Sequence, residues 1–290
     1  MHAMQLELKR LQHINFVVSD YPAAQSHFLT KFGAQHNWEL EIPNRPDDVP
    51  SSLITLGPTL FEIFGPEPVA RHDLGKILRA QGPGFVGIEW GIEDLQAAKQ
   101  AFIDHGVRIR YEPKKRYYPG TWFVSEPADL FGFALECYIG TWYTSELPEG
   151  MKPVAPHEYW RDEHPLGIHE VRNFTVAVRD VDAAATRWQD LTGAAEINVG
   201  PSADSGVRFF EAANTAIGLV GASANSDVGE YVERRGESIY SVTFTVEDAG
   251  RVAEHLTAAS VPVRRVNDAI TVVPAESNHG VRLEFVSAGL

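Results

Sequence analysis

The sequence has little cysteine, few basic residues and no long hydrophobic run. Its one cysteine, Cys137, excludes an internal disulfide framework and is typical of a reducing compartment. The 25 lysines and arginines stand against 39 acidic residues, and no basic cluster of the kind that binds nucleic acid occurs. No apolar run approaches the roughly 20 residues of a membrane span, and the first residues lack an apolar signal region. We therefore expect a cytoplasmic protein with neither nucleic acid nor membrane as a partner.

What the sequence does contain is a strand-like pattern that occurs four times. In each copy apolar residues alternate along a short run that ends in an aspartate, as expected for a strand with one buried face. The aspartates are Asp20, Asp94, Asp180 and Asp248, and seven residues before them stand His13, Gly87, Asn173 and Ser241. Each aspartate is a suitable N-cap for a helix that follows the strand.

Three further extended runs follow each predicted helix, so each repeat is a βαβββ module. The modules span about 11–66, 84–140, 171–222 and 237–288. Residues 141–170 lack a clear period and are rich in Pro, Glu and His, which is typical of a linker. The sequence therefore predicts an α+β protein with a first domain at 1–140, a linker at 141–170 and a second domain at 171–290.

Two module endings and the βαβββ repeat together resemble the vicinal oxygen chelate superfamily. The endings are EPADLFGFALE at 126–136 and PAESNHGVRLE at 274–284. This superfamily includes glyoxalase I, methylmalonyl-CoA epimerase, fosfomycin and bleomycin resistance proteins, and the extradiol dioxygenases. The resemblance implies modules paired into two cup-shaped half-barrels, with metal ligands on the concave face. Four modules and a central linker are similar to the two-domain extradiol dioxygenases.

Carried onto this sequence, the resemblance implies a metal site in the first domain. Its ligands would be His13, Glu62 and Glu136, whereas Gly87 stands where the family has a second histidine. Three protein ligands leave open positions for a substrate. The ion would be a divalent cation such as Mn²⁺, Fe²⁺, Ni²⁺, Co²⁺ or Zn²⁺.

Glu89 lies two residues beyond Gly87 and therefore shares its face of the strand. Three carboxylates that converge in a partly dehydrated cup repel one another, and a cation resolves the conflict. Glu89 is either a further ligand or, with Glu136, a catalytic base. Without a metal, His13 would cap the sheet edge and the glutamates would be solvated or protonated. Gly87 and Gly91 either make room for a substrate or mark a bulge.

The second domain keeps less of the site. The positions expected to match the ligand set are Asn173, Leu219, Ser241 and Glu284. Extradiol dioxygenases of the type resembled hold iron in the second domain on two histidines and a glutamate, and only Glu284 survives here. We therefore expect no metal there, and a structural role, a shared pocket or a dimer contact instead.

The leading hypothesis is a metal-dependent lyase or isomerase that acts on a small organic substrate with adjacent oxygens. The alternatives are an extradiol-type ring-cleavage dioxygenase and a non-catalytic small-molecule binder similar to bleomycin resistance proteins. Several aromatic residues could line a pocket for a ring substrate, although core packing explains them equally well: Tyr117, Tyr118, Trp122, Tyr138 and Trp142. A homodimer is one option for the assembly.

Overall fold

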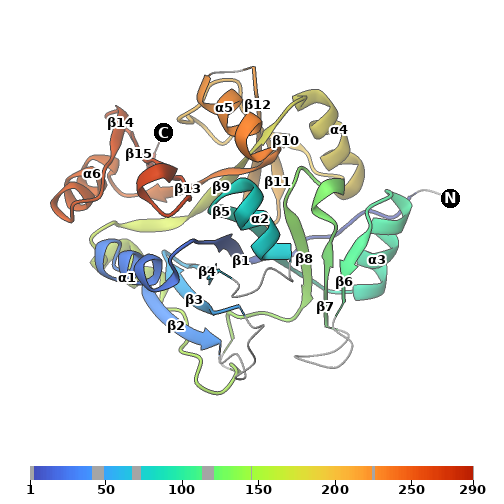
Figure 1. Cartoon of the computed structure of the whole chain (residues 1–290), viewed down its shortest axis with the longest axis horizontal. Coiled ribbons are helices and arrows are strands. Elements are labelled where there is room, and N and C mark those ends of the chain that lie inside the picture. Colours follow the sequence, from blue (N-terminus) through green and yellow to red (C-terminus); the bar gives the residue numbers. More distant parts are fainter. Residues whose placement is uncertain are drawn as a thin grey trace.

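The computed structural model contains two eight-stranded sheets, each built from one half of the chain (Figure 1). It describes residues 3–40, 49–66, 73–112, 121–144, 146–223 and 226–289. In Figure 1 the first sheet and its helices, blue to green, lie mostly below the second, yellow to red. The predicted pairing of modules into two α+β units is confirmed, and neither sheet closes into a barrel.

The first sheet has the strand order β2-β3-β4-β1-β5-β8-β7-β6. Its strands are β1 (Arg10–Val17), β2 (Gln35–Leu40), β3 (Ser51–Leu56), β4 (Thr59–Phe64), β5 (Gly84–Ile92), β6 (Ile109–Tyr111), β7 (Trp122–Ser125) and β8 (Ala134–Ile139). Its helices are α1 (Tyr21–Lys31), α2 (Asp73–Gln81), α3 (Leu95–Asp104) and the short η1 (Pro127–Asp129). The antiparallel β1–β5 pair joins the two modules at the centre of the sheet.

The second sheet repeats this order as β10-β11-β12-β9-β13-β16-β15-β14. Its strands are β9 (Ile168–Val178), β10 (Glu196–Ile197), β11 (Arg208–Ala212), β12 (Thr215–Gly221), β13 (Ser238–Val246), β14 (Arg264–Asn267), β15 (Ile270–Val273) and β16 (Leu283–Ser287). Its helices are α4 (Val181–Thr192), α5 (Ser226–Arg235), α6 (Ala249–Ala258) and the short η3 (Ala275–Ser277), and the turn η2 (Tyr159–Glu163) precedes it. The antiparallel β9–β13 pair is its centre.

The four predicted helix starts are confirmed. Each repeat aspartate is an N-cap whose side chain accepts a hydrogen bond from an amide of the first turn. The helix after Asp180 ends at Gly193, whose φ of 70° is the left-handed conformation that glycine adopts without strain. The repeat therefore fixes where each strand gives way to its helix.

The apolar faces of the two sheets share one hydrophobic core. Trp90 of β5 contacts Phe174 of β9, with ring centroids 5.5 Å apart, and Phe61 of β4 contacts Phe244 of β13. Arg235 of α5 adds polar contacts by donating to the carbonyl oxygens of residues 81–83 beyond α2. The polar faces of the two sheets point away from this core, and we call them the first cup and the second cup.

The predicted linker begins by covering the first cup. Residues 140–144 and 146–155, which we call the covering segment, place Met151 against Leu53 and Leu60 of the first sheet. The domain boundaries at 140 and 171 remain a prediction. Within the described ranges, no helix is both long enough and apolar enough to span a membrane.

Candidate metal centre

Strand register brings the predicted site residues of the first cup together. His13 lies opposite Glu89 in the antiparallel β1–β5 pair, and Glu89 lies beside Glu136 in the parallel β5–β8 pair. On the other side of β1, Glu62 of β4 lies beside Asn15. Because these residues share one face of four adjacent strands, their side chains meet in the first cup.

The His13 ring lies between two carboxylates. Its Nδ1 is 3.3 Å from Oε1 of Glu89, and its Nε2 is 3.6 Å from Oε2 of Glu62. His13, Glu89 and Glu136 each offer one ligand atom, and these atoms lie within 4.8 Å of one another. Glu62 lies on the other side of the imidazole, next to Nε2.

The site is rich in buried negative charge. Burial raises the pKa of Glu62 to about 7, and the nearby Glu136 and Glu89 add to that rise. Burial also raises the pKa of Glu89 to about 7, against the effect of hydrogen bonds from Trp142 and Glu136. For Glu136, burial and the charge of Glu89 raise the pKa well above its usual range. In the described part of the chain no lysine or arginine forms an ion pair with these three carboxylates.

These residues fit a divalent cation. Both ring nitrogens of His13 are buried and lack a hydrogen-bond partner among the described residues, although carboxylate oxygens surround them. Such a set of one imidazole and several carboxylates is suited to Mn²⁺, Fe²⁺, Co²⁺, Ni²⁺ or Zn²⁺. A cation would neutralise the carboxylates and give the imidazole a partner, so the donor set matches the expected group.

The structure shows what surrounds Gly87 and Gly91 of β5. A Cβ on Gly87 would lie 2.9 Å from the carbonyl oxygen of Ala134, so the neighbouring strand excludes a side chain there. A Cβ on Gly91 would lie 2.8 Å from the Gln12 side chain. The β1–β5 register also shifts twice, but the extra residues are Gln12 and Val86, so neither Gly87 nor Gly91 is itself the bulged residue. Close packing against backbone therefore accounts for Gly87, whereas at Gly91 the neighbour is the end of a flexible side chain.

Trp142 of the covering segment reaches the site directly. Its indole N–H donates a hydrogen bond of 2.7 Å to Oε1 of Glu89. Its ring stacks on Tyr138 with centroids 5.3 Å apart and lies 6.3 Å from the ring of Trp38. The sequence marked Trp142 only as a candidate pocket aromatic, because nothing in its spacing connects it with Glu89.

Of the other predicted pocket aromatics, Trp122 is half-buried and packs on Tyr111, with centroids 5.2 Å apart. Tyr117 and Tyr118 lie outside the described residues. Among the described residues, Trp38 and Tyr138 form one aromatic cluster with Trp142, which contacts Glu89.

The second cup repeats the register with other residues. Asn173 takes the place of His13, and Thr243 lies opposite it as Glu89 does in the first cup. Glu284 lies beside Thr243 and so corresponds to Glu136. The expected match of Leu219 with Glu62 is wrong by one residue. Gly218 holds that place beside β9, and Leu219 is buried in the core on the opposite face.

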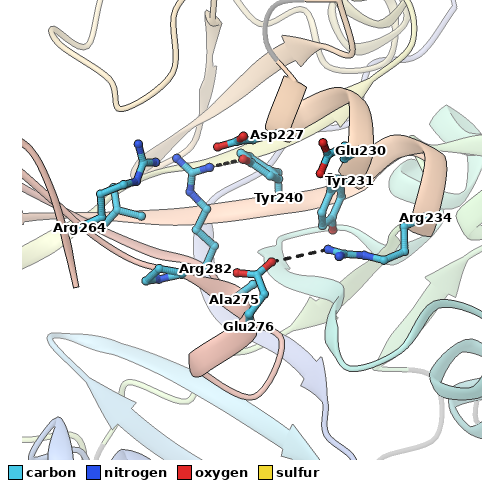
Figure 2. Close-up of a pocket in the computed structure, with 11 residues that line it drawn as sticks. Asp227, Glu230, Tyr231, Arg234, Tyr240, Arg264, Ala275, Glu276 and Arg282 are labelled. Atoms are coloured by element: carbon cyan, nitrogen blue, oxygen red, sulfur yellow. Dashed lines mark hydrogen bonds and ion pairs between the residues drawn. The ribbon is translucent and has the colours of Figure 1, made fainter. Parts of the chain in front are cut away.

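Arg282 forms ion pairs with two carboxylates in the second cup. Its Nη2 lies 2.9 Å from Glu284 and 2.9 Å from Asp204, and it also donates a hydrogen bond to the hydroxyl of Tyr240. Burial raises the pKa of Glu284, and Arg282 opposes that rise. Arg282 lines a cavity of about 280 Å³ beside α5, and Figure 2 shows its contact with Tyr240 there. Within the second cup Glu284 thus has a cationic partner, and the absence of a metal there remains a prediction.

The comparisons with known proteins agree with this architecture. The family model described as Glyoxalase/Bleomycin resistance protein/Dioxygenase superfamily matches residues 10–137 and 167–285. In a sequence comparison, no curated protein matches the chain.

Solved structures with similar folds exist at low sequence identity. One is a triple mutant of 4-hydroxymandelate synthase from Streptomyces coelicolor, with a TM-score of 0.71 and 10% identity over 97% of this chain and 93% of that one. A variant of homoprotocatechuate 2,3-dioxygenase from B. fuscum has a TM-score of 0.63 and 13% identity over 98% and 72%. A xylose isomerase-like TIM barrel/4-hydroxyphenylpyruvate dioxygenase fusion protein has a TM-score of 0.65 and 13% identity, and the match covers all of this chain and 51% of the fusion. At these identities the similarity establishes the fold alone.

Proposed function

Because the chain belongs to the glyoxalase/bleomycin resistance protein/dioxygenase superfamily, we propose that its first cup is the active site of a metal-dependent enzyme. The reaction is an isomerisation, lyase or elimination step in which a proton moves on a small organic substrate with adjacent oxygens. The observation that carries the proposal is the convergence of His13, Glu89 and Glu136 within 4.8 Å. A buried acidic cluster of this kind needs a cation to remain ionised.

His13, Glu89 and Glu136 would hold the metal. A bound divalent ion would supply Lewis-acid stabilisation of negative charge on a substrate oxygen. This ligand set replaces Glu62 of the sequence prediction with Glu89. The reason is geometric, because Glu62 approaches Nε2 of the imidazole whereas Glu89 approaches Nδ1.

Glu62 is then the carboxylate that moves the proton. Its side chain is 12% exposed against 3% for Glu89, so a substrate in the cup reaches it more easily. It is not one of the three clustered ligand residues, and a hydrogen bond with Ser51 restrains it. General acid–base catalysis requires such a group within hydrogen-bonding reach of the substrate proton.

Ring cleavage of a catechol is the second candidate. The aromatic residues Trp38, Tyr138 and Trp142 beside the site favour it, since they offer flat surfaces to a ring. One of the similar folds is a homoprotocatechuate 2,3-dioxygenase variant. The single histidine of the first cup weighs against it, because the resembled dioxygenases use two.

Metal analysis tests the assignment. Chelator-treated protein reloaded with Mn²⁺, Fe²⁺, Co²⁺, Ni²⁺ or Zn²⁺ should hold about one ion per chain. His13→Ala and Glu136→Ala should lose the ion and Glu89→Gln should bind it weakly, whereas Glu62→Gln should keep it and lose turnover. Glu284→Gln, in the equivalent place of the second cup, is the matched control and should keep full metal content. Equal metal in all these variants would show that the site is misassigned.

Two further outcomes separate the rival functions. Iron-loaded protein that consumes oxygen and forms a yellow product from catechols would establish ring cleavage in place of proton transfer. Metal-free protein that binds aromatic ligands tightly, with the same affinity after metal is added, would indicate a non-catalytic binder.

A further inference from the structure

Glu89 is held from outside the sheet by a residue of the covering segment. The hydrogen bond from the Trp142 indole to Oε1 is 2.7 Å long, and the same oxygen lies 3.3 Å from Nδ1 of His13. The Glu89 side chain is only 3% exposed, so water has little access to compete for this oxygen. The orientation of the carboxylate therefore depends on Trp142.

The covering segment is anchored at the residue before His13. The backbone amide of Trp142 donates to Oε1 of Gln12 at 3.0 Å. The Tyr143 hydroxyl donates to the carbonyl oxygen of Gln12 at 2.9 Å and accepts from the amide of Leu60 at 3.1 Å. Burial raises the pKa of Tyr143 to about 12, so its hydroxyl keeps the proton that it donates. Gly91 leaves the space that the Gln12 side chain occupies.

Stacking fixes the indole itself. The planes of Trp142 and Tyr138 are within 6° of parallel, which fixes the plane in which the indole N–H lies. Trp142 and Tyr143 thus connect the segment both to β5, through Glu89, and to β1, through Gln12 beside His13. A shift of the segment would move both sides of the ligand cluster.

We propose that Trp142 is a positioning residue for the metal site, whose indole N–H aims the Glu89 carboxylate at the ion held with His13 and Glu136. This inference rests on the proposed metal function of the first cup. The residue does not touch the ion or the reacting atoms and acts only through Glu89. Hydrogen bonds to metal-bound carboxylates fix their orientation, and losing one typically costs 10- to 100-fold in metal affinity.

Trp142→Phe tests the inference, with Trp38→Phe as the matched control. Both variants lose an indole in the same aromatic cluster, but only Trp142 donates to a site carboxylate. The dissociation constants for Co²⁺ and Zn²⁺ are measured by competition with a chelator, and the visible spectrum of bound Co²⁺ is recorded. Trp142→Phe should bind both ions about 10- to 100-fold more weakly and shift the Co²⁺ bands, whereas Trp38→Phe should match the wild type.

The free energies of unfolding of the chelator-treated variants separate a positioning role from a general packing role. Equal destabilisation of both variants with unequal metal binding supports the inference. Should Trp142→Phe fail to fold, ¹⁵N-indole spectra of the wild type replace it, and the indole resonance hydrogen-bonded to Glu89 should move most on Zn²⁺ addition. An unmoved resonance would overturn the inference.

The remaining outcomes are distinguishable. A wild type that binds Co²⁺ while Trp142→Phe and Trp38→Phe bind it equally would overturn the role of Trp142 and leave the metal site standing. A wild type that binds neither Co²⁺ nor Zn²⁺ would overturn the proposed function and this inference together.

Discussion

Glu136 of the first cup and Glu284 of the second hold equivalent places on the last parallel strand of each sheet, beside Glu89 and Thr243 respectively. Their electrostatic surroundings are opposite. Glu284 forms an ion pair with Arg282 and accepts a hydrogen bond from Thr243. Glu136 faces Glu89, whose charge raises its pKa further. One scaffold therefore places a buried glutamate once beside an arginine and once among other carboxylates, and the proposed cation belongs to the second of these settings.

The comparison explains why the proposed metal site lies in the first cup and not in the second. A buried carboxylate that forms an ion pair with an arginine already has a cationic partner and is less available to bind a metal ion. A carboxylate cluster without such a partner remains able to bind an ion or exchange a proton. The duplicated fold therefore presents the equivalent glutamates, Glu136 and Glu284, in two different electrostatic surroundings.

The largest expected effect comes from breaking the ion pairs of Arg282 in the second cup. Arg282→Met removes the cation that contacts both Glu284 and Asp204, so it should lower the free energy of unfolding by about 3–5 kcal/mol. Urea unfolding followed by circular dichroism measures the change. Arg208→Met is the control, since Arg208 pairs with Glu196 and Asp182 at the surface and should cost less than about 1 kcal/mol. Equal losses would mean that burial adds nothing to the Arg282 network.

Removing the equivalent glutamate should change the free energy of unfolding in opposite directions in the two cups. In chelator-treated protein, Glu284→Gln leaves Arg282 with one carboxylate fewer and should destabilise by about 1–3 kcal/mol. Glu136→Gln removes one of several mutually repelling carboxylates and should stabilise the metal-free protein at pH 8. Unfolding of both variants beside the wild type measures the two changes. Destabilisation of the metal-free protein by Glu136→Gln would mean that the Glu136 carboxylate already makes favourable interactions without a metal.

Glu62 of the first cup should make the stability of the protein depend on pH. The pKa of Glu62 is about 7 in the folded chain against an ordinary 4.5, so the folded state holds this proton more tightly than the unfolded state. The stabilisation that the folded protein gains by holding the Glu62 proton is fully present below about pH 4.5 and is lost as the pH rises through 7. The loss in the free energy of unfolding is about 1 kcal/mol between pH 6 and pH 8. Metal-free wild type should therefore lose that much more stability over this range than Glu62→Gln. Identical slopes would show that Glu62 is ionised throughout.

Strand and helix order could be predicted from the sequence because the repeat encodes it locally. Alternating apolar residues mark each first strand, and Asp20, Asp94, Asp180 and Asp248 mark each helix start. The face that carries His13 and Glu89 follows from the same alternation. These features depend on neighbouring residues, so a single chain reveals them.

Features that depend on distant contacts were out of reach. Trp142 meets Glu89 across 53 residues, and Asp204 meets Arg282 across 78, and no local pattern encodes either pair. The match of Leu219 with Glu62 failed because a one-residue difference in register places Gly218 beside β9 and turns Leu219 into the core. The steric reason for Gly87, the nearby carbonyl of Ala134, also appears only once β5 and β8 are paired.

The smallest expected effect concerns the scaffold that the two halves share. Asp20 and Asp180 cap α1 and α4 with the same geometry, each accepting a hydrogen bond of 3.0 Å from the amide three residues ahead. Asp20→Ala and Asp180→Ala should therefore each cost about 1 kcal/mol of unfolding free energy, and neither should change metal affinity. Urea unfolding measures the loss of stability, and Co²⁺ titration measures the metal affinity. A markedly larger loss for one cap would mean that the helices differ in how they support their sheets, so that the contrast between the cups would extend beyond their polar faces.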